Sequence, residues 1–259
     1  MTRIAIFLIA AIAYLPVTAQ DTNNGENQDN EGAVSSDISL TGEGSQDRVI
    51  FQITFDNWFH QEKLTNGQDF KTRWYSRGAN IYFMFDFEFG DNSIFSFAPG
   101  IGYGHSSIYS NGVIGQDTTS AVFEPRPQRG EDGRKISDIK KNKLALNYLE
   151  IPLELRLRTE PDKKGNSFKL AVGLKGGWLF DVHSKIKYEV PKITSQGRIT
   201  KKVKEQNFEN VFDFRYGPTF RIGYSSVNLI AYYGLSGVFE NGQGPDVKPF
   251  SIGISFNGL

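Results

Sequence analysis

The segment Tyr148–Arg158 alternates apolar and polar side chains over eleven residues without a break. Leucine and isoleucine occupy every second position, and tyrosine, glutamate, proline and arginine occupy the positions between them. A period of two is that of a β-strand with two unlike faces, because a helix would spread the charges around its circumference. The segment is also longer than the usual strand of a soluble domain, which has about five or six residues. It therefore predicts a long strand with one face toward an apolar environment and the other among charged groups.

Seven further segments show the same alternation, so that the chain contains a series of strands with one apolar and one polar face. Their lengths suit strands rather than helices, and many of their apolar positions hold phenylalanine. The eight predicted strands are Val49–Trp58, Ala79–Phe89, Ile94–Ser107, Tyr148–Arg158, Phe168–His183, Phe208–Tyr224, Val227–Phe239 and Val247–Phe256.

The connections between these strands alternate in length. The short ones, at residues 90–93, 161–166 and 225–226, are rich in the residues of tight turns. The long ones include residues 184–207 and residues 108–143, which we expect to form a mobile loop. When strands run up and down, all short turns lie at one end of the sheet and all long connections at the other. This predicts an all-β fold, an eight-stranded antiparallel up-and-down β-barrel with both chain ends at the short-turn end.

Periodicity alone does not distinguish a membrane barrel, which is apolar outside, from a secreted ligand-binding barrel, which is apolar inside. About ten residues per strand, tilted by roughly 40–45°, span about 25 Å, which is the height of a lipid band. Small residues such as Gly100 and Gly102 lie on the polar face and fit the crowded interior of a narrow barrel. Trp58, Trp74 and Tyr75 lie where strands meet long connections, as an interfacial aromatic girdle would. These features favour a transmembrane β-barrel.

The N-terminal part of the chain is expected to lie outside the barrel. Arg3 precedes an apolar run from Ile4 to Leu15 and a small-residue cleavage site ending at Ala19, which predicts a signal peptide over residues 1–19. Residues 20–47 are acidic and contain no lysine, arginine or aromatic residue, so we expect a disordered periplasmic tail. Residues 48–259 then form the barrel, in the outer membrane, with both of its ends in the periplasm.

The overall composition excludes several classes of function. A formal net charge of +0 gives no reason to expect nucleic acid as a partner. The sequence has no cysteine and therefore no disulfide, thiolate metal site or cysteine nucleophile. A mean hydropathy of −0.38 argues against a bundle of membrane helices. Neither a metal-ligand spacing nor a phosphate-binding glycine loop occurs, and we expect no cofactor.

The polar faces of the predicted strands carry charges that would point into the barrel. A lone charge in a narrow lumen is costly, so these residues are expected to pair with one another and to plug the lumen. The alternative is a path for protons or a solute. The expected network consists of Glu150, Glu154, Arg156, Arg158, Lys169, Lys175, Asp213, Arg215 and Arg221.

The connection at residues 184–207 is rich in lysine. One interpretation is a solvated hairpin above the membrane, and the other is contact with the phosphates of lipopolysaccharide in the outer leaflet. The residues expected to make that contact are Lys185, Lys187, Arg198, Lys201 and Lys202.

The strongest candidates for catalysis are His105 and Ser107, which lie two residues apart and therefore project from the same, lipid-facing side of one strand. This local arrangement is similar to that of outer-membrane lipid A deacylases, and a Ser–His pair facing lipid could attack an acyl ester. Such a site also needs a carboxylate on a neighbouring strand, which the sequence does not identify. We therefore expect a protein without enzymatic activity, with a lipid A-modifying hydrolase and a small porin or ligand carrier as alternatives.

The strand that begins Tyr148-Leu149-Glu150-Ile151-Pro152-Leu153 resembles the PorT-like outer-membrane β-barrel family of Bacteroidetes. The stretches Phe95–Gly102 and Leu170–Gly177 are similar to neighbouring strands of that family, and the resemblance extends over about residues 48–256. It implies an outer-membrane barrel, and for some members an accessory role in protein export by the type IX secretion system. The partners expected on this basis are membrane lipid, lipopolysaccharide, and secretion or envelope proteins that contact the loops or the N-terminal tail.

Overall fold

The computed structural model describes residues 49–59, 62–90, 93–117, 120–193, 196–206, 208 and 210–257. The chain divides into two units, and every described residue belongs to the unit formed by residues 38–259. The predicted signal peptide and acidic tail lie outside the described residues. No helix in the described ranges is long and apolar enough to cross a membrane.

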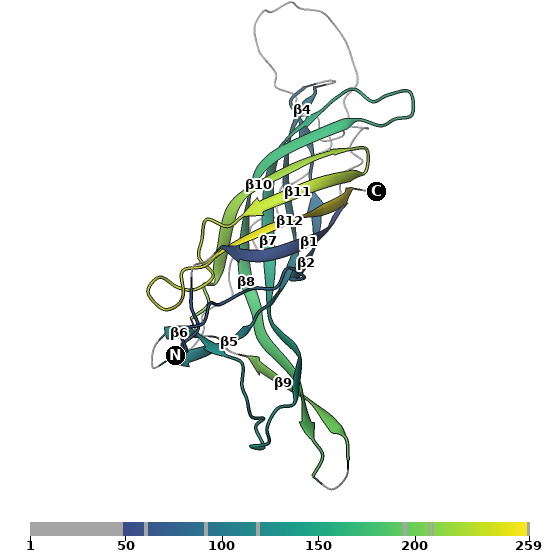
Figure 1. Cartoon of the computed structure of the whole chain (residues 1–259). Helices are drawn as coiled ribbons and strands as arrows, with labels where there is room; N and C mark the ends of the chain where they lie inside the picture. The colour runs from purple at the N-terminus through teal and green to yellow at the C-terminus, as the bar shows by residue number, and fades with distance from the viewer. Residues whose placement is uncertain are drawn as a thin grey trace, which may run out of the picture. The chain divides into compact units, whose positions relative to one another are not determined.

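Eight strands of the described chain close into an antiparallel ring, which confirms the expected fold (Figure 1). Going around the ring, the order is β1-β2-β4-β7-β8-β10-β11-β12, and β12 pairs with β1. The bounds of the ring strands are β1 Val49–Phe59, β2 Arg77–Met84, β4 Phe95–Tyr109, β7 Asp138–Arg158, β8 Phe168–Pro191, β10 Phe214–Tyr224, β11 Val227–Tyr233 and β12 Lys248–Asn257. The short strand β3 Phe87–Glu88 continues β2 along β4.

The two faces of the ring have opposite character. In β1, Phe51, Ile53 and Phe55 point outward and are 44%, 51% and 60% exposed, whereas the intervening Gln52 and Thr54 are buried inside. The same alternation runs through β7, whose odd-numbered residues from 149 to 155 are exposed leucine and isoleucine. An apolar exterior around a polar interior is the arrangement of a barrel surrounded by lipid.

Tight turns join the strands at one end of the ring, which we call the short-turn end. Gly90, Gly165 and Ser225 adopt positive φ angles of 118°, 80° and 56° there. Such angles suit glycine and are uncommon for other residues, which explains why turn-forming sequences mark these connections. Both the first residue of β1 and the last residue of β12 lie at this end, as the alternating connection lengths predicted.

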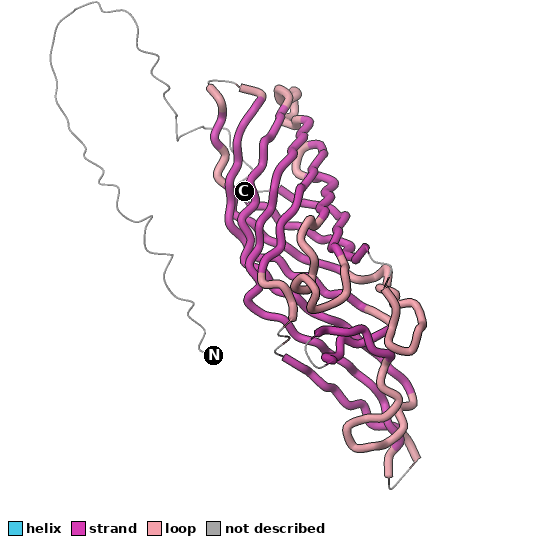
Figure 2. The backbone as a smooth tube through the Cα atoms, turned by 90° about the vertical axis from the view of Figure 1, so that its left-hand side faces the viewer, coloured by secondary structure: helices cyan, strands magenta, loops and turns pink. Residues whose placement is uncertain are grey.

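The opposite end, which we call the extended end, is more ordered than predicted. Strand β7 begins at Asp138 and β8 continues to Pro191, and both project beyond the ring together with β9 Arg198–Gln206 (Figures 1 and 2). Residues 108–143 also contain a hairpin of β5 Gly112–Asp117 and β6 Ser120–Pro125. The prediction of a loop was therefore wrong for the residues that form β5, β6 and the start of β7. The reason is an apolar inner face on the extension, which holds the segment in place.

That inner face consists of Ile186, Tyr188 and Val190, which are buried against side chains such as Val113 and Ile139. The alternation of buried and more exposed side chains in β8 thus continues beyond His183, the predicted end of this strand. The positions between the buried residues beyond His183 are mostly lysines. A segment rich in lysine resembles a solvated loop when the sequence is considered alone.

An apolar cluster fills the interior of the barrel at the extended end. Trp58 is 5% exposed, its ring stacks 6.3 Å from those of Phe70 and Phe123, and Phe70 and Phe123 lie 3.7 Å apart. Phe239 closes the cluster from the β11–β12 connection. The prediction that Trp58 belongs to an exposed girdle was therefore wrong. Its position in β1 places it on the inner face with Gln52 and Thr54, so the alternation itself argued for an inward side chain.

The outward face of β7 provides a test of the lipid-facing assignment. We expect Leu153→Arg to lower the free energy of unfolding in lipid vesicles by about 2–4 kcal/mol, because an arginine near the middle of the band loses its hydration. The matched control is Val227→Arg, at an outward position where a strand meets a turn, with an expected loss of about 0–1 kcal/mol. Urea unfolding followed by tryptophan fluorescence measures both. Equal, small losses for both variants would contradict the assignment.

Candidate functional site

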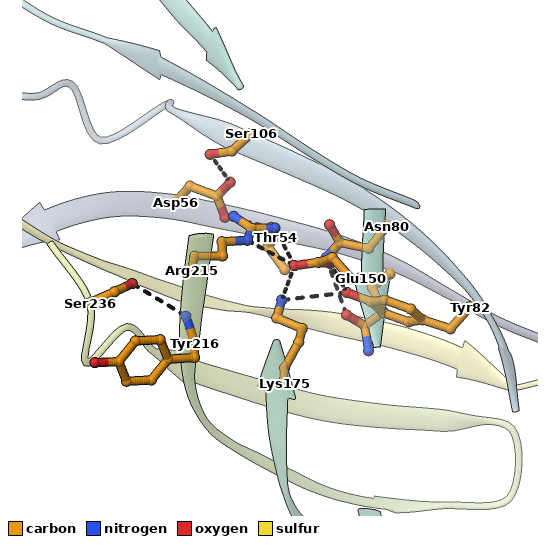
Figure 3. A network of polar contacts seen from close by, with 11 residues as sticks. Thr54, Asp56, Asn80, Tyr82, Ser106, Glu150, Lys175, Arg215, Tyr216 and Ser236 are labelled. Carbon is orange, nitrogen blue, oxygen red and sulfur yellow. Dashed lines mark hydrogen bonds and ion pairs between the residues drawn. The ribbon is translucent and has the colours of Figure 1, made fainter. Parts of the chain in front are cut away.

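Glu150 is the centre of a charge network inside the barrel (Figure 3). Its side chain is fully buried, and one carboxylate oxygen lies 2.6 Å from Arg215 Nη2 and 3.3 Å from Lys175 Nζ. The other oxygen accepts a hydrogen bond of 2.5 Å from the Tyr82 hydroxyl. The Arg215 guanidinium also stacks 3.8 Å above the ring of Tyr148. Every partner therefore compensates the cost of burying this carboxylate.

A second group of charges lies nearer the short-turn end. Glu154 accepts hydrogen bonds from Arg221 at 2.6 Å and from Arg156 at 2.9 Å. Arg156 and Arg158 both lie 3.2 Å from a carboxylate oxygen of Asp86. Asp86, which follows β2, completes this group although it was not among the predicted residues. Its place on the polar face of the predicted second strand was the signal that could have identified it.

The two remaining predicted members of the network are Lys169 and Asp213. Lys169 is half-buried opposite Arg158, at the short-turn end of the lumen. Asp213 immediately precedes β10 and is exposed, so its inclusion in the lumen network was wrong. The predicted sixth strand began at Phe208, whereas β10 begins at Phe214, and the alternation does not reach Asp213.

Glycines create the space that the central pair occupies. A Cβ atom on Gly104 would lie 2.3 Å from Glu150 Oε2 and 2.8 Å from Arg215 Nη2. One on Gly177 would lie 3.2 Å from side-chain atoms of both residues. The small residues on the polar face thus allow two large charged side chains to meet inside a narrow barrel.

The outer face of the extension carries six lysines in a regular array, which we call the lysine face. Lys141 pairs with Lys187 across β7 and β8, and Lys187 pairs with Lys202 across β8 and β9. Directly opposite residues in an antiparallel sheet share a face, so like charges lie side by side. No carboxylate of the described chain forms an ion pair with these lysines. The six are Lys141, Lys143, Lys185, Lys187, Lys202 and Lys204.

The structure divides the predicted lipopolysaccharide contacts between two faces. Lys185, Lys187 and Lys202 belong to the lysine face. Lys201 instead pairs with the buried Tyr188 in the sheet and lies 2.6 Å from Asp132. Arg198 pairs with Pro191 and therefore shares the side of the lysine face, where it lies 3.5 Å from Glu189. Hydrogen bonds from Arg134 and Lys201 hold the pKa of Asp132 below its usual range. Lys201 and Arg198 are therefore engaged by carboxylates. Sequence reasoning grouped Lys201 with the other cations because it lacked the register of β8 with β9.

A cationic cleft of about 490 Å³ adjoins the lysine face. Arg73, Arg77 and Arg126 line it together with Lys141. The Arg126 Nε atom is buried without a hydrogen-bond partner among the described residues. Burial lowers the pKa of Arg126, and the neighbouring positive charge of Arg73 lowers it further. An anionic group is the ligand that such a cleft would accept.

Two of the three predicted girdle residues are exposed on this end of the molecule. Trp74 is 79% exposed and Tyr75 is 42% exposed, and both belong to the connection between β1 and β2. Their rings meet edge to face at 5.9 Å, and Tyr75 also borders the cationic cleft. A role at the membrane interface stays a prediction for this pair.

His105 and Ser107 lie together on the outer wall, below the lysine face. The distance between His105 Nε2 and Ser107 Oγ is 2.9 Å. On the other side of the imidazole, His105 Nδ1 lies 2.6 Å from Asn147 Oδ1, on the neighbouring strand β7. The sequence did not identify the carboxylate that a deacylase-like site needs on a neighbouring strand, and the structure places an asparagine amide at that position. Among the described residues, no cluster of histidine and carboxylate side chains is suited to hold a metal ion.

Residues 26–240 match the family model described as outer membrane protein beta-barrel domain. No curated protein matches the sequence.

Removal of the central carboxylate tests the lumen network. We expect Glu150→Ala to lower the free energy of unfolding by about 3–5 kcal/mol, because Arg215 and Lys175 are left buried without their counter-ion. Glu160→Ala, on the exposed turn between β7 and β8, is the matched control and should change stability by less than about 0.5 kcal/mol. Urea titration of both purified barrels measures the difference. Similar stability of the two variants would show that the network contributes little.

Proposed function

We propose that this chain, which belongs to the outer membrane protein beta-barrel domain family, is a non-conducting membrane protein that acts through its extended end. The barrel is that of an outer-membrane protein. The observation that carries the proposal is the filling of its interior by paired charges and aromatic rings.

The closed lumen is inferred from the side chains that the described part of the chain places inside the barrel. The paired charges around Glu150 and Glu154 occupy its middle, and the aromatic cluster around Trp58 occupies the extended end. A cavity of about 30 Å³ beside Tyr82 is the space of about one or two water molecules. Together these features support a plugged lumen. Eight-stranded barrels generally have interiors only wide enough for side chains.

The extended end is the part that we assign to the cell exterior, with both chain ends in the periplasm. Outer-membrane barrels have short periplasmic turns and longer extracellular loops. In this chain the short-turn end holds both termini of the ring, and the extended end holds the hairpins and the three-stranded extension.

With this orientation, the lysine face and the cationic cleft lie at the level of the outer-leaflet headgroups. Lysine and arginine bind phosphate groups, and each contributes about 1 kcal/mol near an anionic surface. We assign these surfaces to the phosphates of lipopolysaccharide. None of the six lysines forms an ion pair with a described carboxylate, and we infer that an external anion relieves their mutual repulsion.

The resemblance to the PorT-like proteins of Bacteroidetes adds a cellular role to this assignment. Some of those proteins are accessories of protein export, and a plugged barrel with a large extracellular surface suits an accessory that binds other envelope components. We therefore assign this protein to secretion or to envelope organisation, with its loops or its N-terminal tail as the surfaces that contact protein partners.

Electrical recording tests the closed lumen. The folded protein, identified by its altered gel migration before boiling, should show no stable conductance steps in a planar lipid bilayer. The physical reason is that ions would have to separate buried pairs such as Glu150 and Arg215. Reproducible steps from the folded protein would instead favour the second candidate function, a small porin.

Binding of lipopolysaccharide tests the lysine face. We expect the double variant Lys185→Gln/Lys187→Gln to bind lipopolysaccharide roughly 10- to 30-fold more weakly, because two cationic contacts of about 1 kcal/mol each are lost. The matched control is Lys163→Gln/Lys164→Gln, which removes two exposed lysines at the short-turn end. Titration calorimetry in detergent at two salt concentrations measures both, since screening should weaken the specific contact. Equal affinity for the two double variants would contradict the assignment.

A further inference from the structure

A chain of polar contacts crosses three strands on the outer wall. It starts at Ser107 in β4, passes through His105 to Asn147 in β7, and continues to Asp181 in β8. Asn147 Nδ2 donates a hydrogen bond of 2.6 Å to Asp181 Oδ2, which also lies 2.9 Å from His183 Nδ1. A β-bulge between Asn147 and Tyr148 interrupts the register of β7 with β8 at this point. Bulges commonly re-aim side chains at functional positions.

The contacts define which nitrogen of His105 carries the proton. An ionised Asp181 only accepts hydrogen bonds, so Asn147 must present its amide nitrogen to that carboxylate and its oxygen to His105. The Tyr103 hydroxyl donates to the same Asn147 oxygen at 2.7 Å, which supports this orientation. His105 Nδ1 therefore donates to Asn147, and its Nε2 carries the lone pair that faces the Ser107 hydroxyl. This is the tautomer that a general base requires.

A positive charge lies beside the serine. Lys143 Nζ donates a hydrogen bond of 2.8 Å to Ser107 Oγ. The ammonium group favours negative charge that develops on or near that oxygen. It also covers the hydroxyl, because Ser107 is only 3% exposed. The flexible lysine stem allows the ammonium group to move aside when a ligand enters.

The position of this serine along the wall indicates the chemical class of its ligand. Tyr103, Leu149 and Trp178 form an exposed apolar row on the side toward the short-turn end. Lys143 and Lys185, opposite one another on β7 and β8, begin the lysine face on the other side. In a bilayer, the acyl ester of a phosphate-bearing lipid lies between its hydrocarbon chains and its phosphate. A lipid in contact with this wall would therefore place its ester near Ser107.

From this geometry we propose that Ser107, His105 and Asn147 form a nucleophile, a general base and a positioning residue that hydrolyse the acyl ester of a phosphate-bearing lipid. The activity goes beyond the proposed accessory role, and it replaces the expectation of a protein without enzymatic function. Only the choice of a phosphate-bearing substrate rests on the proposed binding of phosphate at the lysine face.

The reaction is a hydrolysis in two steps. Ser107 Oγ attacks the ester carbonyl carbon and transfers its proton to His105 Nε2, and His105 then protonates the departing alcohol oxygen as the ester bond breaks. Water attacks the resulting acyl-serine and gives a proton to His105. Release of the fatty acid returns that proton to Ser107. Asn147 accepts the hydrogen bond from Nδ1 throughout and keeps the imidazole in the required tautomer.

Labelling of the serine tests the nucleophile independently of lipid binding. The full-length protein in detergent is treated with a fluorophosphonate, which forms a bond to an activated serine oxygen and releases fluoride, and the labelled peptide is identified by mass spectrometry. We expect labelling at Ser107, its loss in Ser107→Ala, and a strong decrease in His105→Ala. Ser226→Ala, in the exposed turn between β10 and β11, should label like the unchanged protein. The gel shift before boiling shows that each variant is folded.

Fatty-acid release tests the substrate class. The same proteins are incubated with vesicles of phosphatidylethanolamine and, separately, with purified lipopolysaccharide. We expect release from one or both, with a decrease of at least about 10³-fold in folded Ser107→Ala. Release from phosphatidylethanolamine alone identifies a glycerophospholipid as the source of the ester, and release from lipopolysaccharide alone identifies lipid A. Labelling of Ser107 without release from either overturns the substrate class. Absence of both labelling and release overturns the proposal, whether or not lipopolysaccharide binds.

The positioning role of Asn147 needs a measurement that a purely structural role would not change. Asn147→Ala should lower kcat by roughly 10²–10⁴-fold with little change in KM, because the base loses its tautomer and orientation. The double variant Asn147→Asp/Asp181→Asn exchanges the two groups, so that a carboxylate again accepts from His105 while an amide donates to it. Recovery of kcat in this double variant supports the role. Equal kcat values in Asn147→Ala and the unchanged protein would contradict the positioning role of Asn147.

Discussion

The closed ring of backbone hydrogen bonds is the constraint on which the rest of this structure depends. In hydrocarbon there is no water to satisfy backbone N–H and C=O groups, so a sheet that crosses a membrane must have no free edge. Pairing of β8 with β10 and of β12 with β1 removes those edges. Once the ring is closed, every second side chain faces lipid and the others face a narrow interior. Apolar and polar residues therefore alternate along β7 because one of its faces contacts lipid and the other faces the interior of the barrel.

The interior imposes a second condition, because charges in it have little water to compensate them. The sequence meets this condition by placing two cations beside each of the two buried glutamates: Arg215 and Lys175 beside Glu150, and Arg221 and Arg156 beside Glu154. Glycines such as Gly104 provide the necessary space. At the extended end, the interior contains aromatic rings instead of charges. Two different kinds of packing thus occur in two parts of one lumen.

At the extended end, β7 and β8 continue beyond the ring and β9 pairs with β8, and the outer face changes from apolar to cationic. The inner face of the extension remains apolar and packs against the hairpin of β5 and β6, so the extension is an ordered platform. The contacts between Ser107, His105 and Asn147 lie at the boundary between the apolar row and the lysine face. A lipid has the same boundary in its own structure, between its acyl chains and its phosphate. This correspondence connects the proposed phosphate binding with the proposed ester hydrolysis.

The sequence by itself determined the barrel, because a period of two and turn-forming residues are local properties that need no knowledge of distant partners. It also determined that Glu150, Lys175 and Arg215 face inward, since alternation assigns each residue to a side. Which side chains of different strands meet was decided by the register between strands, and register depends on the whole sheet. Only the tertiary structure showed that Trp58 belongs to an inner cluster with Phe123, and that Lys201 faces away from Lys202. It likewise placed Asn147 beside His105, because residues 42 positions apart meet only when β4 pairs with β7.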